Sequence, residues 1–223
     1  MDKEKRHFKE SLKQDEFKSF IHHIIDFFRD PVKLNKSLNW GIGVLLVALV
    51  VWGYTAYKSN VDTQVYKAIG TAKVKMANKD IDTAIQNLKT TARDYPSSSM
   101  LGAVNYYLGQ CYEQKGDLEG GLKAYGDAVN SYLPESILPA AYMSYAYALE
   151  AKQDFTKAVS VYDELLKKMP NYFGAGEVLL NQARNLRLAG KLPEAAAKYK
   201  AVVDKYPDSA WAYTAKQFVQ YGV

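Results

Sequence analysis

Residues 101–134 read LGAVNYYLGQCYEQKGDLEGGLKAYGDAVNSYLP, and this stretch decides the fold. Leu108–Tyr112 belong to a first helix, which ends in the turn Lys115-Gly116-Asp117 because glycine supplies the backbone freedom that a helix end needs. A second helix is predicted for Leu118–Tyr132, and Pro134 prevents its continuation. The stretch therefore predicts a helical hairpin, two helices joined by a tight turn.

The pattern of this hairpin recurs with a step of 37 residues. Three series of residues keep the step: Ala72, Gly109, Ala146 and Ala183; Ala84, Gly121, Ala158 and Ala195; and Leu88, Tyr125, Tyr162 and Tyr199. A fixed period of roughly 20–50 residues indicates stacked units, none of which buries its apolar face alone. We therefore predict four units at about 62–97, 98–134, 135–171 and 172–207, followed by a C-terminal capping helix at 208–223.

These units resemble the tetratricopeptide repeat (TPR). That family has a small residue deep in the first helix, a second small residue where the two helices cross, an aromatic residue shortly after it, and a terminal proline. Here the prolines are Pro96, Pro134, Pro170 and Pro207. Small residues matter because only glycine or alanine lets two helix backbones approach closely. The resemblance implies an all-α fold, a TPR helical-hairpin solenoid, preceded in this chain by one transmembrane helix.

The period departs from that of the family, whose usual repeat is three residues shorter. The spacing between the two small positions is conserved, so the surplus falls between a proline and the core of the next unit, for example in Ser97–Met100. We interpret this surplus as a first helix that is longer by nearly one turn.

A single apolar segment precedes the repeats. Ser37–Tyr57 contains no charged residue and is bracketed by Lys36 and Lys58. About 20 residues suffice for a helix to cross a bilayer, and aromatic residues lie near both ends, as in interfacial belts. We predict an uncleaved transmembrane helix at 37–58. A cleaved signal peptide is disfavoured because the charged lead is too long for a usual n-region.

The positively charged residues near this segment predict its orientation. Arg29, Lys33 and Lys36 flank its N-terminal side, whereas Lys58 stands alone on the other side until Lys67. Such a bias leaves the N-terminus in the cytoplasm and carries the repeats across the membrane. Residues 1–36 form the cytoplasmic lead, in which 16–29 have the pattern of an amphipathic helix that would lie in the headgroup layer or dock on a partner.

A charged lead, one membrane helix and slightly long TPR units are together similar to the bacterial ancillary Sec-translocon subunit family. Members of that family sit in the inner membrane, expose their repeats to the periplasm, and associate with the translocon and with periplasmic chaperones. The resemblance therefore implies a single-pass protein of the bacterial inner (plasma) membrane. Its implied partners are translocon subunits, periplasmic chaperones or exported clients, with the lipid membrane contacted through residues 37–58.

In TPR proteins, the first helix of each unit lines a concave groove that binds peptides. Carried onto this sequence, the protein-binding residues are Tyr66, Ile69, Lys73, Tyr106, Gln110, Glu113, Met143, Tyr147, Glu150, Glu177, Leu180, Arg184 and Arg187. This mixture of aromatic, apolar and charged groups suits a peptide partner. Packing against neighbouring helices is an equal explanation for Tyr106, Met143 and Leu180. Arg184 and Arg187 either hold a carboxylate or form an exposed, solvated pair.

The composition offers no catalytic or metal-binding set. All three histidines (His7, His22 and His23) precede the apolar segment, and the one cysteine, Cys111, lies inside a predicted helix as a buried thiol. The net charge of +5 is spread along the chain, unlike the clustered charge of a nucleic-acid-binding face. We therefore expect no enzyme activity, no cofactor, no metal and no nucleic-acid partner.

The leading hypothesis is a membrane-anchored TPR scaffold that binds other proteins outside the cytoplasm, during export or envelope-protein folding. One alternative is a structural tether or self-assembling scaffold, a homo-oligomer, for cell-envelope or division machinery. Another is a docking adaptor whose repeats face the cytosol.

Overall fold

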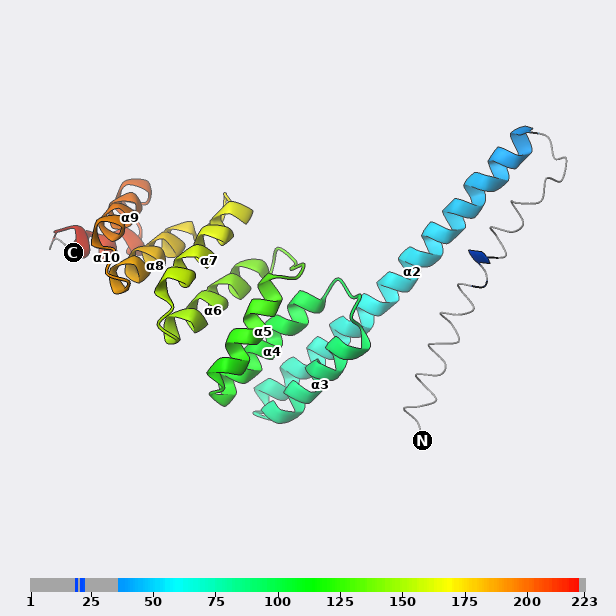
Figure 1. Ribbon diagram of the computed structural model, residues 1–223, viewed down its shortest axis with the longest axis horizontal. Coiled ribbons are helices and arrows are strands. Elements are labelled where there is room, and N and C mark those ends of the chain that lie inside the picture. Colours follow the sequence, from blue (N-terminus) through cyan, green and yellow to red (C-terminus); the bar gives the residue numbers. More distant parts are fainter. Residues whose placement is uncertain (1–18, 20, 23–35, 221–223) are drawn as a thin grey trace. The chain divides into compact units, whose positions relative to one another are not determined.

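The computed structural model describes residues 19, 21, 22 and 36–220, and within them the regular structure is helical (Figure 1). The predicted amphipathic helix at 16–29 lies outside the described residues except for 19, 21 and 22, which are helical. The labelled helices are α2 (Lys36–Ala77), α3 (Ile81–Asp94), α4 (Leu101–Lys115), α5 (Leu118–Val129), α6 (Leu138–Ala151), α7 (Phe155–Lys168), α8 (Ala175–Leu188), α9 (Leu192–Lys205) and α10 (Ala210–Gln220).

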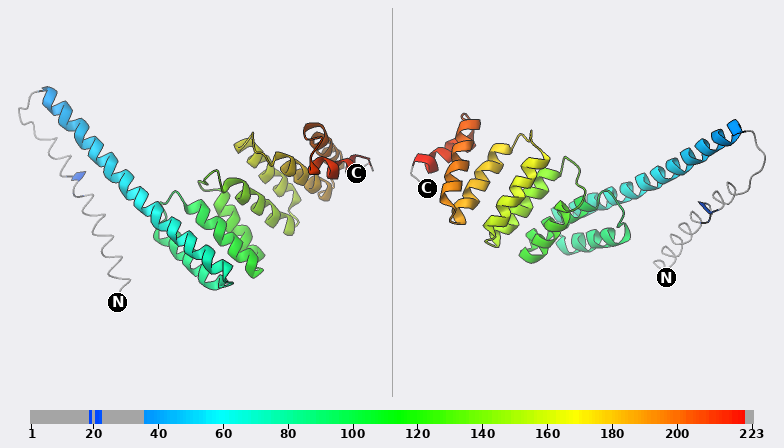
Figure 2. Two further views of the ribbon diagram at one scale, coloured as in Figure 1. Left: turned by 180° about the vertical axis from the view of Figure 1, so that it is seen from behind. Right: turned by 45° about the horizontal axis from the view of Figure 1, so that its top comes forward.

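The chain divides into two compact units, and the boundary between Ala56 and Tyr57 falls within α2. In the second unit, antiparallel helix pairs stack in chain order, and each helix from α3 to α10 packs on the next (Figures 1 and 2). The C-terminal half of α2 shares a hydrophobic core with α3 and α4 through Val65, Ile69 and Ala72. The predicted all-α TPR solenoid is confirmed, with α10 packed on α8 and α9.

The two helices of each hairpin meet at the small residues of the repeat. The crossing positions are alanines with zero exposure in the first, third and fourth hairpins, as Ala72 and Ala84 illustrate. In the second hairpin they are the buried residues Gly109 and Gly121. A Cβ atom on Gly109 would lie 2.5 Å from ring carbons of Tyr125, a distance that real side chains do not show. A Cβ on Gly121 would meet nothing nearer than 3.7 Å. A methyl group at 109 therefore requires the ring of Tyr125 to move, whereas one at 121 fits in place.

The turn inside each hairpin places one residue in the left-handed region, again with the step of 37. These residues are Lys79 (φ 60°), Gly116 (φ 77°), Gln153 (φ 62°) and Gly190 (φ 76°). In the hairpin of α4 and α5, the Gly116 N–H donates to Glu113 O (3.0 Å) and the Asp117 N–H to Tyr112 O (2.9 Å), which satisfies the last carbonyls of α4. Two of the four turns thus use glycine, and two place a side chain where it is disfavoured.

The surplus of three residues lies in the connections, and our interpretation of a longer first helix is wrong. Ser97–Met100 are not helical, and α4 begins at Leu101. Asp62 on α2 explains the conformation, because it accepts hydrogen bonds from the Ser98 hydroxyl (2.7 Å), the Ser99 hydroxyl (2.5 Å) and the Ser99 N–H (3.0 Å). Burial opposes ionisation of Asp62, but these hydrogen bonds prevail and lower its pKa. The connection is therefore fastened to the preceding hairpin.

The second helix of this hairpin also differs from the expectation. It ends at Val129, three residues before the predicted end at Tyr132, and Pro134 lies in the following connection. Cys111, which we expected to be a buried thiol, is completely buried inside α4. Burial raises the pKa of this thiol to about 11.

The two glycines of the second hairpin allow a matched test of the crossing. We expect Gly109→Ala to lower the free energy of unfolding by about 1–3 kcal/mol, because the new methyl group overlaps Tyr125. Gly121→Ala should raise it by about 0.5–1 kcal/mol, because alanine loses less backbone entropy in a helix. Urea unfolding of both variants, followed by circular dichroism, measures the two values; equal effects would contradict the assigned crossing geometry.

The left-handed turn positions allow a second comparison. Gln153→Gly should stabilise the chain by about 0.5–1 kcal/mol, since glycine adopts a positive φ without steric cost. Gly116→Ala should destabilise it by about 1 kcal/mol, although no atom lies near its Cβ position. The same denaturation measurement decides, and a destabilising Gln153→Gly would show that the turn has another conformation.

Candidate protein-binding face

The candidate site is the A-helix face, which we define as the predicted binding residues on α2, α4, α6 and α8. Tyr66, with 68% exposure, and Tyr147, with 41%, present aromatic surface, and Lys73 and Glu113 are also exposed. The residues of intermediate exposure are Gln110, Met143, Glu150, Glu177, Leu180, Arg184 and Arg187.

Two of the predicted residues are buried. Ile69, with 5% exposure, belongs to the core of the first hairpin, and Tyr106, with 8%, to the core of the middle hairpins. Tyr106 leans on Tyr125, with ring centroids 6.1 Å apart. Met143 and Leu180 are partly buried and pack on the same kind of core. These four side chains therefore support the face from within and offer a partner little or no surface.

Acidic residues of the face are held by tyrosines of the second helices. The Tyr125 hydroxyl donates to Glu113 Oε2 (2.5 Å), and one repeat later the Tyr162 hydroxyl donates to Glu150 Oε1 (2.9 Å). Burial, and then the adjacent carboxylate, raises the pKa of both tyrosines, so they remain neutral donors. Each pair joins a core aromatic ring to a carboxylate at the surface, which fixes where the charge lies.

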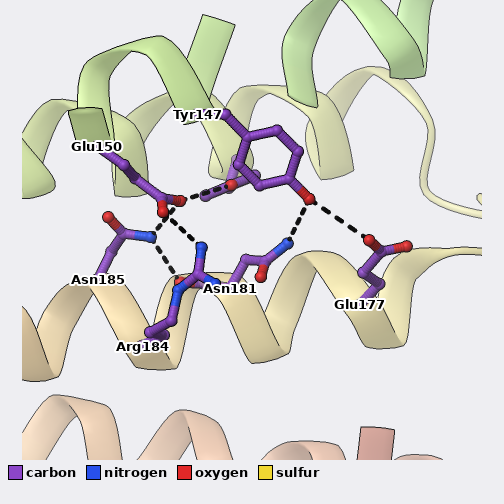
Figure 3. A network of polar contacts seen from close by, with 7 residues as sticks. Tyr147, Glu150, Glu177, Asn181, Arg184 and Asn185 are labelled. Atoms are coloured by element: carbon purple, nitrogen blue, oxygen red, sulfur yellow. Dashed lines mark hydrogen bonds and ion pairs between the residues drawn. The ribbon is translucent and has the colours of Figure 1, made fainter. Parts of the chain in front are cut away.

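A polar network joins neighbouring hairpins around Glu150 (Figure 3). Glu150 accepts hydrogen bonds from Asn185 Nδ2 (2.7 Å) on α8 and from the guanidinium of Arg184, in addition to that from Tyr162. Its side chain is 15% exposed. The network therefore orders α6, α7 and α8 at their common face.

Tyr147 extends the network along the same face. Its hydroxyl accepts from Asn181 Nδ2 (3.2 Å) and donates to Glu177 Oε1 (3.4 Å), so both of its hydrogen-bonding roles are filled from α8 (Figure 3). The ring of Tyr147 packs edge-on against Tyr162, with centroids 6.5 Å apart. An exposed aromatic side chain is thereby held in one position.

The N-terminal part of the face has a different set of contacts. The ammonium group of Lys73 lies 5.4 Å from the ring centroid of Tyr107, a cation–π contact between α2 and α4. Gln110 Nε2 donates to the hydroxyl of Tyr106 (2.8 Å). The structure therefore places these predicted residues in two local groups, one on α2 and α4 and one on α6 and α8.

Sequence reasoning missed the buried amides of α8. Asn181, Gln182 and Asn185 are all buried, and Gln182 Nε2 donates to Asp163 Oδ1 (2.5 Å). The sequence does contain a signal for these buried amides, since three amide residues surround the small residue Ala183. Polar side chains beside a helix crossing are buried and need hydrogen-bond partners.

The carboxylates and tyrosines of this face form hydrogen bonds with one another and with amides. Within residues 36–220, no three His, Cys, Asp or Glu side chains gather in a way that would hold a metal ion.

Loss of the central carboxylate tests the network. Glu150→Ala should lower the free energy of unfolding by about 3 kcal/mol, since it removes one of two acceptors of the buried Asn185 amide and the acceptor of both a tyrosine hydroxyl and a guanidinium. The control is Glu119→Ala, which removes an exposed ion pair with Lys152 and should cost less than about 0.5 kcal/mol. Denaturant unfolding measures both, and similar losses would contradict the central role of Glu150.

Comparisons with known proteins agree with this architecture. Family models described as tetratricopeptide repeat match residues 69–132 and, as two further repeats, 140–172 and 177–209, together more than half of the chain. No curated protein matched the sequence. Within the described residues, one helical segment, Trp40–Ala77, is long and apolar enough to cross a membrane.

Solved structures of low sequence identity share the fold. A TPR protein from Parabacteroides merdae ATCC 43184 has a TM-score of 0.59 at 17% identity; the match covers 71% of this chain and 59% of that one, less than two thirds of its length. YrrB, a TPR protein with an unusual peptide-binding site, has a TM-score of 0.53 at 18% identity, with 81% and 88% covered. MamA from Desulfovibrio magneticus RS-1 has a TM-score of 0.53 at 13% identity, with 70% and 82% covered.

At these identities the structures show a common fold alone, whereas the repeat models match the sequence itself. The chain belongs to the tetratricopeptide repeat family.

Proposed function

We propose that this protein is a single-pass membrane scaffold that binds other proteins outside the cytoplasm through the A-helix face, in protein export or envelope-protein folding. The observation that carries the proposal is the combination, in one chain, of an exposed apolar helix and a TPR array with a partly unsatisfied polar face.

The N-terminal part of α2 supports the membrane anchor. Several of its large apolar side chains are exposed, as Trp40 with 78% exposure and Trp52 with 70% illustrate. Apolar area costs about 25 cal/mol per Å² when water covers it, so a helix exposed over this whole length needs another solvent. A bilayer supplies that solvent, and the tryptophans near the two ends fit its interfaces.

The distribution of basic residues supports an outward-facing array. Arg29, Lys33 and Lys36 precede the apolar segment, and only Lys58 follows it closely. By the positive-inside rule, the repeats then lie on the far side of the membrane from the N-terminus.

The chemistry of the A-helix face supports a peptide or protein partner. Tyr147, which is held by hydrogen bonds to α8, presents apolar area with little loss of side-chain entropy on binding. The carboxylate of Glu150 and the guanidinium of Arg184 lie on the same face and favour a partner of complementary charge. YrrB, which shares the fold, is itself a peptide binder.

The place in export or envelope folding rests on the order of the parts, a charged lead, one membrane helix and TPR units, as in the ancillary Sec-translocon subunit family. Translocon subunits, periplasmic chaperones and exported clients are accordingly the proposed partners.

Crosslinking in cells tests this proposal. With a photoreactive amino acid at Tyr147, we expect adducts with translocon subunits, chaperones or envelope proteins in transit, identified by mass spectrometry. The same group at Lys123, exposed on α5, is the control and should yield few adducts. Adducts only between copies of this chain would replace the proposal with the self-assembling scaffold.

Protease accessibility tests the topology in the same cells. The repeats should be degraded in spheroplasts and protected in intact cells, because the outer membrane excludes the protease. Protection that persists in spheroplasts and ends only on lysis would place the repeats in the cytosol and refute the proposed orientation.

A further inference from the structure

The connections between hairpins lie along one edge of the second compact unit. Neighbouring helices run antiparallel, so the turns inside the hairpins form one edge and the connections from each hairpin to the next form the other (Figure 1). The connections are 95–100, 130–137, 169–174 and 206–209. We call the edge that they form the connection edge.

The chain enters the second unit at this edge. Tyr57 is the first residue of the unit and the last residue of the uncharged segment. Asp62, less than two turns further along α2, holds the connection 95–100 through the hydroxyls of Ser98 and Ser99. The helix rises about 8 Å between Tyr57 and Asp62. The connection edge therefore begins close to the point where the apolar segment ends.

The third connection presents an aromatic side chain to solvent. Phe173 is 87% exposed, more than Trp40 or Trp52 of α2. The backbone on both sides of it is hydrogen-bonded, because the Tyr172 N–H donates to Met169 O (3.1 Å) and the Ala175 N–H donates to Tyr172 O (3.0 Å). The ring of Tyr172 packs on the core and lies 4.9 Å from that of Phe173. An ordered connection thus holds Phe173 outward.

Two lysines precede this connection. Lys167 and Lys168 are exposed in the last turn of α7, and among residues 36–220 neither forms an ion pair. The sequence contains no carboxylate side chain between Glu164 and Glu177. Apolar area beside ammonium groups favours adsorption on an anionic lipid surface, where the ring enters the headgroup layer and the lysines approach the phosphates.

The second connection adds aromatic area to the same edge. Tyr132 lies in 130–137 and is 71% exposed. Tyrosine favours the interface between lipid and water, because its ring is apolar and its hydroxyl is polar. The exposed carboxylate in this connection belongs to Glu135, so the positive charge of the edge comes mainly from the lysines of α7.

We propose that the connection edge docks on the lipid surface of the membrane that α2 crosses. Phe173 lies in the headgroup layer, and Lys167 and Lys168 contact anionic headgroups. The proposal rests on the membrane anchor proposed above and names a second partner of the repeat domain, anionic lipid. Because the anchor keeps the domain beside the bilayer, contacts that are individually weak suffice for docking. Two copies of the chain that met at this connection would instead bring like charges together.

The first experiment locates the edge by fluorescence in the full chain, reconstituted in vesicles of phosphatidylethanolamine and phosphatidylglycerol. An environment-sensitive dye is attached at Asn171→Cys, an exposed position beside Phe173, and at Thr156→Cys, exposed at the other end of α7. The chain's own Cys111 is buried, and the wild type treated with the same dye gives the background.

The measured quantity is quenching by a lipid that carries a nitroxide on its headgroup. We expect the dye at 171 to be quenched about threefold more than the dye at 156, since the length of α7, about 20 Å, separates the two positions. Vesicles of phosphatidylcholine alone, or raised salt, should reduce this difference, because both weaken the attraction of the lysines. Equal quenching at 171 and 156 would overturn the docking.

Variants then test the residues themselves. Phe173→Ser, and Lys167→Gln combined with Lys168→Gln, should each lower the quenching at 171 about twofold or more. The matched control is Lys79→Gln combined with Lys191→Gln, which removes the same charge from exposed turns on the opposite edge and should change nothing. All of these side chains are exposed, so circular dichroism melting should be unaltered. Full quenching in a folded Phe173→Ser would refute its insertion.

A third dye position separates this inference from the anchor on which it rests. Val47→Cys places the dye in the apolar part of α2, where a nitroxide on the lipid acyl chain should quench it. Quenching at 47 without preferential quenching at 171 would overturn the docking and leave the anchor standing. No quenching at 47 would refute the anchor, and the docking with it.

Discussion

Everything in the repeat domain depends on how closely the two helices of a hairpin approach at their crossing. The crossing residues are alanine in three hairpins and glycine in the remaining one, and they are buried. In the second hairpin, Tyr125 of α5 reaches across to α4 at this separation, and its ring covers Gly109. Close packing of this kind is intolerant of added volume. The placement of the aromatic core, and of each polar group attached to it, follows from that spacing.

The tyrosines connect the core to the surface. Tyr125 and Tyr162 have buried rings, and their hydroxyls emerge next to carboxylates of the first helices. Glu150 of α6 accepts hydrogen bonds from Arg184 and Asn185 of α8, and these bonds join two neighbouring hairpins. In repeat arrays, neighbouring units supply much of the stability. The same contacts that order the A-helix face therefore also couple its hairpins.

The sequence predicts the fold well because the features that determine it are local and repeated. A tight turn, two small residues and a large apolar residue, aromatic in three of the four hairpins, recur at one spacing, and each has a short-range steric reason. The orientation of single side chains is less accessible, because it depends on neighbours from other hairpins. Ile69 and Tyr106 lie on the predicted face by register but turn into the core. The helical interpretation of Ser97–Met100 failed because Asp62, 36 residues before Ser98, holds that connection. Asn181 and Asn185 were missed since their partners lie one repeat away.

Cys111 can report local unfolding of the second hairpin. It is the one cysteine of the chain, it lies fully buried in the second hairpin, and its thiol has a pKa of about 11. At neutral pH only about one thiol in ten thousand is then ionised, and thiolates are the reactive form. A thiol reagent can modify the chain only when this hairpin opens. The protein thus contains an intrinsic reporter whose labelling rate follows local unfolding of one repeat, without any engineered probe.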